Sequence, residues 1–315
     1  MTGARDMEPF RSILVDIDAT AAYHPELDRA VRLARAAGAK LTIADVMSVP
    51  PEARAYLSED LERQLVSHRR DQLENVARTV AGVPVQAVLL SGRPATALIR
   101  EVLRSGHDLL VRSHARDLVA RPPAPYGAIN MELFRQCPCP VLVEGPGAAV
   151  THPRILGAVH ATSEDPADQA LNAKIVELTL LVARLEQGTP MLLHAWEPYA
   201  EELVRRYAGG ETVPAYVASA AERGRESLMR SAAPVRDRVA ETQMFLRRGW
   251  PDDVIPEFAV AEGVDLVVMG SVARSGISGF LIGNTAERVL RKLTCSVLTV
   301  KPDDFVSPVR LEGPP

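Results

Sequence analysis

Residues 126–144 read YGAINMELFRQCPCPVLVE, and residues 282–300 read IGNTAERVLRKLTCSVLTV. Laid over each other without a gap, the two stretches pair Gly127 with Gly283 and Cys139 with Cys295, and both pairs are 156 positions apart. A glycine, a helical pattern, a cysteine and an apolar strand follow in the same order over nineteen positions. A match of that length indicates that the chain carries one folding unit twice.

The repeat extends outward from these stretches in both directions. RILGAVHAT at 154–162 matches RSILVDIDAT at 11–20, and PMLLHAWEP at 190–198 matches LTIADVMSVP at 41–50. We therefore expect two domains, an N-terminal one over residues 1–148 and a C-terminal one over residues 149–315. The stretch GPGAAVTHP at 145–153, rich in Gly, Ala and Pro, is the expected linker.

Short apolar runs alternate with helical patterns throughout the first half. The expected strands are residues 12–18, 41–47, 83–92, 107–111 and 139–144, and the expected helices are residues 25–40, 51–80, 94–106 and 126–137. Strands that alternate with helices are typical of an α/β fold with a parallel sheet covered on both faces. The same order in the second half predicts a second such sheet.

Composition limits the classes of partner. The chain of 315 residues has a net charge of -4 and 4% aromatic residues, so nothing favours nucleic acid or an anionic membrane surface. Asp16 and Asp18 interrupt the first apolar run, and no charge-free run approaches the length of a membrane span. Three cysteines are an odd number, unlike a secreted disulfide framework. We expect a cytoplasmic protein.

The segment GSVARSGISGFLIGNTAERVLRKLTCSVLTVKP at 270–302 resembles the C-terminal signature of the universal stress protein family, and the ending at 283–311 is similar to the E-type tandem members. The resemblance covers essentially the whole chain. It implies two open, twisted five-stranded parallel sheets, Rossmann-like and similar to adenine-nucleotide alpha hydrolases. Relatives pair their last strands across a two-fold axis, so the halves are expected to form an intramolecular pseudo-dimer, with a further homodimer as an added expectation.

The resemblance also implies a ligand site at the carboxyl ends of the strands. Relatives that bind ATP carry Gly-x-x-Gly, nine residues, then Gly and Ser or Thr, which brings backbone amides close to the phosphates. Here Gly270 and Gly283 match, Ala273 replaces the second glycine, and Asn284 replaces Ser or Thr. The expected site in the C-terminal half comprises Val159, His160, Ala195, Met269, Gly270, Ser271, Ala273, Arg274, Gly283, Asn284 and Thr285.

Each half departs from the nucleotide-binding pattern in its own way. In the C-terminal half His160 stands where ATP-binding relatives carry Asp, and in the N-terminal half the equivalent Asp18 is present, with Val46 and Gly127 as further expected contacts. However, the N-terminal loop at 112–127 has no glycine before Gly127 and contains three prolines, which lack an N–H. Arg112 is assigned to this loop. Alternatively, Gly283-Asn-Thr-Ala-Glu merely starts a helix, with Asn284 as N-cap and Glu287 completing a capping box.

Other constellations carry little chemistry. Cys137-Pro-Cys139 aligns with a single cysteine before a buried strand, so we interpret it as apolar packing and expect no metal site. No complete Walker loop or nucleophile elbow occurs, and no catalytic residues are expected. The candidates for an apolar pocket floor beside Arg274 are Trp196, Trp250, Phe280, Leu281 and Ile282. The alternative for Trp196 and Phe280 is core packing.

The family resemblance implies a stress-response protein, and the loop and pocket residues predict that it binds a small anionic or amphipathic ligand, mainly in the C-terminal half, without strong enzymatic activity. No tightly held cofactor is expected, and ATP or AMP is expected to bind weakly. Two alternatives remain open: an ATP-binding protein with slow ATPase or phosphotransfer activity, and an interaction scaffold whose pockets are vestigial.

Overall fold

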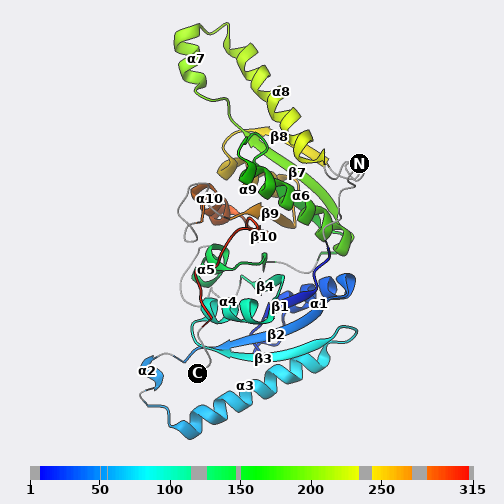
Figure 1. Cartoon of the computed structure of the whole chain (residues 1–315), viewed down its shortest axis with the longest axis vertical. Helices are drawn as coiled ribbons and strands as arrows, with labels where there is room; N and C mark the ends of the chain where they lie inside the picture. The colour runs from blue at the N-terminus through cyan, green and yellow to red at the C-terminus, as the bar shows by residue number, and fades with distance from the viewer. Residues whose placement is uncertain are drawn as a thin grey trace.

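A computed structural model of the chain describes residues 8–49, 51–54, 56–114, 126–146, 150–233, 243–271 and 282–311. Within these ranges ten strands form one sheet in the order β3-β2-β1-β4-β5-β10-β9-β6-β7-β8 (Figure 1). Their bounds are β1 (Ser12–Asp16), β2 (Lys40–Met47), β3 (Val85–Ser91), β4 (Leu109–Ser113), β5 (Val141–Glu144), β6 (Arg154–Ala158), β7 (Thr189–Trp196), β8 (Gln243–Arg248), β9 (Leu266–Gly270) and β10 (Ser296–Val300).

Helices connect the strands. Their bounds are α1 (Pro25–Ala37), α2 (Pro51–Arg54), α3 (Glu59–Thr79), α4 (Pro94–Ser105), α5 (Ala128–Gln136), α6 (Pro166–Glu186), α7 (Glu201–Ala208), α8 (Val213–Ser231), α9 (Pro251–Ala261) and α10 (Asn284–Lys292). Helix α1 shows how the sequence sets such bounds. Pro25 occupies its first turn, and Gly38 ends it in the left-handed region, with φ of 69°.

The two halves have the same topology. In each half all neighbouring strands are parallel, and the first strand lies between the second and the fourth. The α/β fold with tandem units is thus confirmed. The last strands of the halves pair as the family resemblance implies: β5 runs antiparallel to β10, with Val143 opposite Val297, so the halves pack as a pseudo-dimer through one continuous sheet.

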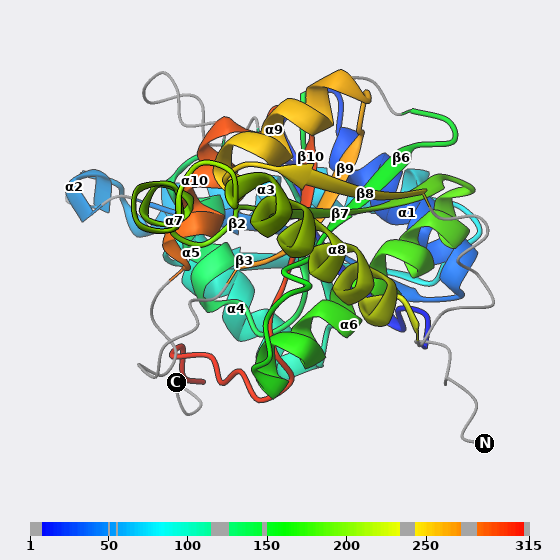
Figure 2. The same cartoon turned by 90° about the horizontal axis from the view of Figure 1, so that it is seen from above.

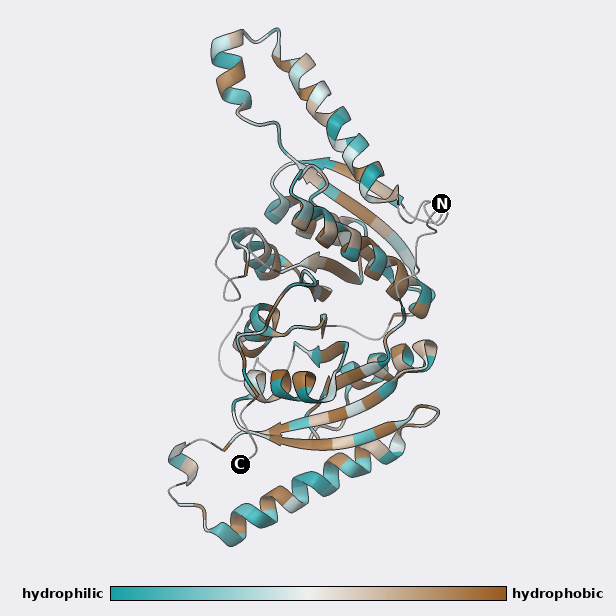
Figure 3. Ribbon diagram, in the orientation of Figure 1, coloured by the Kyte–Doolittle hydropathy of each residue, from teal (hydrophilic) through white to brown (hydrophobic). Residues whose placement is uncertain are grey.

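Two hydrophobic layers cover the sheet, one on each face, and each layer crosses from one half to the other. The first holds side chains of α1, α3, α6 and α8, and the second holds side chains of α4, α5, α9 and α10. Figure 2, viewed from above, shows these helices on opposite sides of the strands. In Figure 3 the strands are largely apolar, whereas the outer surface of α3 is polar. Both halves therefore share one hydrophobic core on each face of the sheet.

Some elements differ from the sequence expectation. The predicted helix over 51–80 is two helices, because Ser58 caps the start of α3 by accepting a hydrogen bond from the Leu61 amide at 3.3 Å. Strand β4 continues to Ser113, two residues beyond the prediction. Helices α7 and α8 form an arm that projects beyond β8 (Figure 1).

The segment after β10 returns to the N-terminal half, where the structure describes it as far as residue 311 (Figure 1). Arg100 of α4 donates to the carbonyl oxygen of Arg310 at 3.2 Å, and Val309 packs against the core layer that contains α4. This segment is a second link between the halves. Among the described residues, no helix is long and apolar enough to cross a membrane.

Candidate functional site

A cavity of about 310 Å³ lies in the C-terminal half, where β6, β7 and β9 end and α10 begins. The chain leaves β6 toward β7 on one side and returns to β9 on the other, so the carboxyl ends of β6 and β9 mark the point where the strand order reverses. Parallel α/β sheets place ligands at this point. The lining residues are Ala158, Val159, His160, Asp168, Leu171, Asn172, Ile175, Ala195, Pro251, Ile255, Met269, Gly270, Gly283, Asn284, Thr285, Ala286 and Val289.

The structure brings most of the predicted C-terminal site residues to this cavity. Those that line it are Val159, His160, Ala195, Met269, Gly270, Gly283, Asn284 and Thr285. Ser271 lies elsewhere: it is fully buried, and its hydroxyl donates to the carbonyl oxygen of Phe134 in the N-terminal half at 2.9 Å. Ala273 and Arg274 fall outside the described residues. Ser271 therefore joins the two halves and is not part of the cavity wall.

The polar side of the cavity is built between β6 and α6. The His160 amide donates to the Asn172 side-chain oxygen at 2.9 Å, and the Asn172 amide group donates back to the His160 carbonyl at 2.8 Å. This reciprocal pair fixes the backbone where β6 ends. The Nδ1 atom of His160 lies 3.8 Å from a carboxylate oxygen of Asp168, which also accepts from the Ser163 hydroxyl at 2.6 Å. The cavity thus presents an imidazole and a carboxylate side by side.

Sequence reasoning missed Asp168 and Asn172. Both belong to α6, four positions apart, so the helical period places them on one face. That spacing was a signal in the sequence. Its meaning depends on α6 lying against the end of β6, which no local pattern reveals.

A second histidine lies below His160. His194 of β7 is 1% exposed, its Nδ1 atom donates to the Val159 carbonyl at 3.3 Å, and the two imidazole rings lie 6.2 Å apart. Burial lowers the pKa of His194 to about 4. His194 is therefore neutral at neutral pH and supports the strand end beneath the cavity.

The N-terminus of α10 faces the cavity. Gly283 is its N-cap residue, with φ of −63° and no side-chain hydrogen bond, so the prediction that Asn284 caps the helix is wrong. The capping box with Glu287 is absent as well, since Glu287 pairs with Arg291 at 2.7 Å. Because no side chain of the described residues caps this end, the first amides of α10 are suited to an anionic group.

Gly270, which lines the cavity as predicted, also has a packing role. A Cβ atom on this residue would lie 2.8 Å from a methyl carbon of Leu171 in α6. The glycine therefore lets α6 lie close to the end of β9.

Trp250 departs from expectation. It is the N-cap residue of α9, its side chain is 64% exposed, and it does not line the cavity. The residues that α9 contributes to the cavity are Pro251 and Ile255.

Three cavity positions have counterparts in the N-terminal half. Strand register pairs Ala158 with Met269 in one half and Asp16 with Arg112 in the other. Ala286 is the third residue of α10, as Asn130 is the third residue of α5. The C-terminal half thus has two methyl groups and one longer apolar side chain where the N-terminal half has an acid, a base and an amide.

These three polar side chains are hydrogen-bonded to one another. Arg112 donates to Asp16 at 2.7 Å and to the Asn130 side-chain oxygen at 2.8 Å, and all three residues are buried. We name Asp16, Arg112 and Asn130 the N-terminal polar cluster. The assignment of Arg112 to an exposed loop is wrong, because the residue lies in β4 and its charge is neutralised inside the protein.

The predicted N-terminal contacts are occupied in a similar way. Arg69 of α3 donates to Asp18 at 2.8 Å and to the buried carboxylate of Asp45 at 2.5 Å. Val46 is 8% exposed within the core, and Gly127 is the N-cap residue of α5. In the N-terminal half, the polar groups at the strand ends are therefore hydrogen-bonded to other side chains of the same half.

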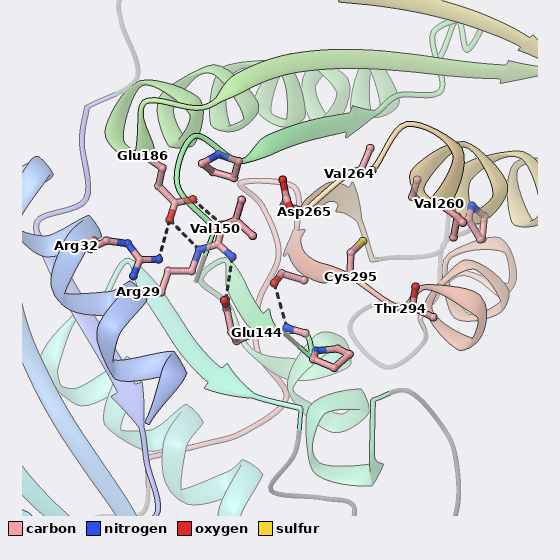
Figure 4. A pocket seen from close by; sticks show the side chains of 17 residues that line it. Arg29, Arg32, Glu144, Val150, Glu186, Val260, Val264, Asp265, Thr294 and Cys295 are labelled. Atoms are coloured by element: carbon pink, nitrogen blue, oxygen red, sulfur yellow. Dashed lines mark hydrogen bonds and ion pairs between the residues drawn. The ribbon is translucent and has the colours of Figure 1, made fainter. Parts of the chain in front are cut away.

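A larger cavity of about 530 Å³ lies between the halves, beside α1, α6 and α9 (Figure 4). Its charged side chains neutralise each other: Arg29 donates to Glu144 at 2.8 Å and to Glu186 at 2.5 Å. Burial disfavours the charged form of Arg29, but the two carboxylates outweigh burial and raise the pKa of Arg29. We regard this cluster as a structural link between the halves. Among the described residues, no group of three or more His, Cys, Asp or Glu side chains is placed to hold a metal ion.

Comparison with known proteins gives consistent matches along the chain. The model of the universal stress protein family matches residues 9–143 and 154–301. Universal stress protein E of Escherichia coli K12 is 30% identical over 315 residues, covering 97% of this chain and 98% of that protein.

Solved structures match over the same length. A protein of Pseudomonas aeruginosa PAO1, described as functionally unknown, is 27% identical, with a TM-score of 0.69 and 94% of each chain covered. A universal stress protein of Archaeoglobus fulgidus shares the fold, with a TM-score of 0.62 at 13% identity.

Proposed function

Because the chain belongs to the universal stress protein family, with two tandem domains and full-length similarity to universal stress protein E, we propose that it is a stress-response protein that binds a small ligand in its C-terminal half. The observation that carries this proposal is the contrast between the halves. At equivalent positions the C-terminal half has Ala158, Met269 and Ala286 around a cavity, and the N-terminal half has the polar cluster.

The chemistry of the cavity supports an anionic or amphipathic ligand. The uncapped start of α10 suits an anionic group, because free amides and the helix dipole both favour negative charge there. Leu171, Ile175 and Ile255 offer apolar surface to the rest of the ligand. His160 and Asp168 supply a donor and an acceptor for a hydroxyl or an amide. We therefore propose binding of a ligand at this site, without strong enzymatic activity.

We expect ATP to bind weakly at this site. His160 replaces a permanently ionised carboxylate, and Ala273 adds a methyl group to the phosphate loop. A loss of about 1–3 kcal/mol at each of the two contacts corresponds to roughly ten- to hundredfold apiece in affinity. Isothermal titration with ATP should give little heat for the parent, and Ala273→Gly combined with His160→Asp should restore binding.

The alternative is a nucleotide-binding protein with slow ATPase activity, favoured by the retained Gly270, Gly283 and start of α10. Micromolar binding of ATP by the parent protein would put this alternative first. Weak binding together with recovery in the double variant would support the proposal above.

The ligand itself can be tested without knowing its identity. Native mass spectrometry of freshly purified protein, compared with the mass after unfolding, should reveal a bound small molecule. The triple variant Ala158→Asp, Met269→Arg and Ala286→Asn transplants the N-terminal polar cluster into the cavity, and it should fold but lose the ligand. The reverse triple variant Asp16→Ala, Arg112→Met and Asn130→Ala is the matched control and should keep it. Equal retention of ligand by both variants would show that the cavity is not the site.

A further inference from the structure

Two buried cysteines touch each other where α5 passes into β5. Cys137 and Cys139 are 0% and 9% exposed, and their sulfur atoms lie 3.6 Å apart. The sequence interpretation treats this Cys-Pro-Cys stretch as apolar packing. Contact between the two sulfurs opens another possibility, because adjacent thiols can be joined by a disulfide when the sulfurs approach to about 2.05 Å.

A buried lysine lies beside the thiols. Thr299 of β10 is paired with Val141 of β5, so Lys301, two residues further along, comes opposite Cys139. Lys301 is 2% exposed, its Nζ atom has no hydrogen-bond partner among the described residues, and that atom lies 5.1 Å from the centre of the Phe305 ring. An amine in this position requires either the neutral form or a nearby anion.

The groups around the cluster favour a thiolate on Cys137. Burial raises the pKa of the Cys137 thiol, but the hydrogen bond from Cys139 and the charge of Lys301 together bring the pKa of Cys137 below its ordinary value. The hydrogen bond to Cys137 and burial raise the pKa of Cys139. Burial also lowers the pKa of Lys301 to about 8.

Two further charged groups act on the cluster. Lys174 of α6 disfavours the charged form of Lys301, and Asp108 disfavours the thiolate of Cys139. Burial of Lys301 and the charge of Lys174 oppose transfer of a proton from Cys137 to Lys301, whereas the attraction between a Cys137 thiolate and a Lys301 ammonium favours it.

We propose that Cys137 and Cys139 form a reversible oxidation site for small hydroperoxides, with Lys301 holding the reactive thiolate. This role is separate from ligand binding in the C-terminal cavity. The oxidant must be small, because Cys137 is enclosed and Cys139 exposes only 9% of its surface. Hydrogen peroxide meets that condition, whereas glutathione disulfide does not.

The reaction proceeds in two balanced steps. The Cys137 thiolate attacks one oxygen of the peroxide, the O–O bond breaks, and the departing hydroxide takes a proton from the Lys301 ammonium to leave as water. The sulfur of Cys139 then attacks the sulfenic acid on Cys137, and its thiol proton and the sulfenic hydroxyl leave together as a second water. The two thiols lose two electrons and the peroxide gains them. The disulfide closes around a single proline, so we expect a small thiol to reduce it readily.

The test uses the full-length protein, freshly reduced and then treated with hydrogen peroxide. The product is unfolded, alkylated with N-ethylmaleimide and weighed intact. Of the three cysteines, two should become unreactive, and dithiothreitol should restore both. In the matched control Cys295→Ser, both remaining cysteines should become unreactive toward N-ethylmaleimide after peroxide treatment. Cys139→Ser cannot close the disulfide, so it should stop at the sulfenic acid, detectable as a dimedone adduct on Cys137.

The lysine is tested by Lys301→Met, which keeps an apolar stem but lacks the amine. We expect its oxidation at neutral pH to be about tenfold slower, with the midpoint of the pH–rate profile displaced upward by about one unit. Circular dichroism checks that the variant is folded; if it is not, dimedone labelling of Cys139→Ser still tests the thiolate on Cys137. Three reactive cysteines after peroxide treatment that fully oxidises free glutathione would overturn the proposal. So would equal rates and pH profiles in the parent and folded Lys301→Met.

Discussion

Arg112 and Met269 occupy equivalent places in the two halves and illustrate how single residues decide the character of each. Met269 exposes an apolar edge to the C-terminal cavity, whereas Arg112 binds Asp16 and Asn130. A buried ion pair of this kind contributes little net stability but is costly to break, because one uncompensated charge is then left inside. Substitutions in the N-terminal polar cluster should therefore replace Asp16, Arg112 and Asn130 together, so that no buried charge is left without its partner.

His194 gives a pH-dependent prediction at the same scale. Its pKa is about 4 in the folded protein, against about 6.5 for an unperturbed histidine. Below pH 6.5 the unfolded chain binds a proton at His194, whereas the folded protein does not until the pH approaches 4. The contribution of neutral His194 to the free energy of unfolding is therefore fully present above pH 6.5 and is lost as the pH falls toward 4. Between pH 7 and pH 5 the free energy of unfolding should drop by about 2 kcal/mol more in the parent than in His194→Gln.

Urea unfolding at the two pH values measures this difference. His68→Gln, on the exposed surface of α3, is the control and should keep the pH response of the parent. The same pH response in His194→Gln and in the parent would show that His194 is not the buried neutral group.

Among the elements, the junction of β5 and β10 is tightly packed. Gly145 follows β5, and its amide donates to the Ser296 hydroxyl at 3.0 Å. Tyr126 adds a second contact by donating to the Cys295 carbonyl at 2.5 Å. The two strands approach so closely here that only a residue without a side chain fits.

Gly145→Ala should weaken this junction. The added Cβ atom would lie 2.6 Å from the Cys295 carbonyl carbon and 2.7 Å from the Ser296 nitrogen, and these backbone atoms have little freedom to move. We expect the free energy of unfolding, measured in denaturant, to fall by about 1–3 kcal/mol. Gly210→Ala is the matched control, because its added Cβ would meet nothing within 4 Å, and its effect should stay within about 0.5 kcal/mol. Equal effects of the two substitutions would contradict the steric argument.

Strands and helices were predictable because their periods are written locally, and the repeat showed that the same sheet occurs twice. Pairing of β5 with β10 followed from family resemblance, and its register did not follow from any local pattern. The partner of Arg112, Asp16, is 96 residues away, so sequence placed the arginine in a loop. Asp168 was missed for a similar reason: its neighbour His160 belongs to another element. Contacts between distant segments, which packing determines, are the part that the sequence left open.

At the scale of the whole molecule, the two halves share both core layers and one sheet. Separated chains of residues 1–148 and 149–315 would expose the paired edges of β5 and β10. An exposed strand edge is a template for association. The domain boundary remains a prediction, and the separated halves test it together with the junction.

Each half expressed alone should self-associate or aggregate, as measured by light scattering after size-exclusion chromatography. Mixed in equal amounts during refolding, the halves should recover a one-to-one complex through the β5–β10 edge. Two stable, soluble monomers would mean that the antiparallel junction contributes little to the fold.

The covalent connection across that junction has a thermodynamic consequence. Two separate subunits joined by the same strands would dissociate on dilution, since mass action favours free subunits at low concentration. Here both edges belong to one chain, and the tether at 145–153 sets their effective concentration. The midpoint of unfolding should therefore stay constant when the protein is diluted about a hundredfold. Pairing of β5 with β10 therefore does not depend on the concentration of the protein in the cell.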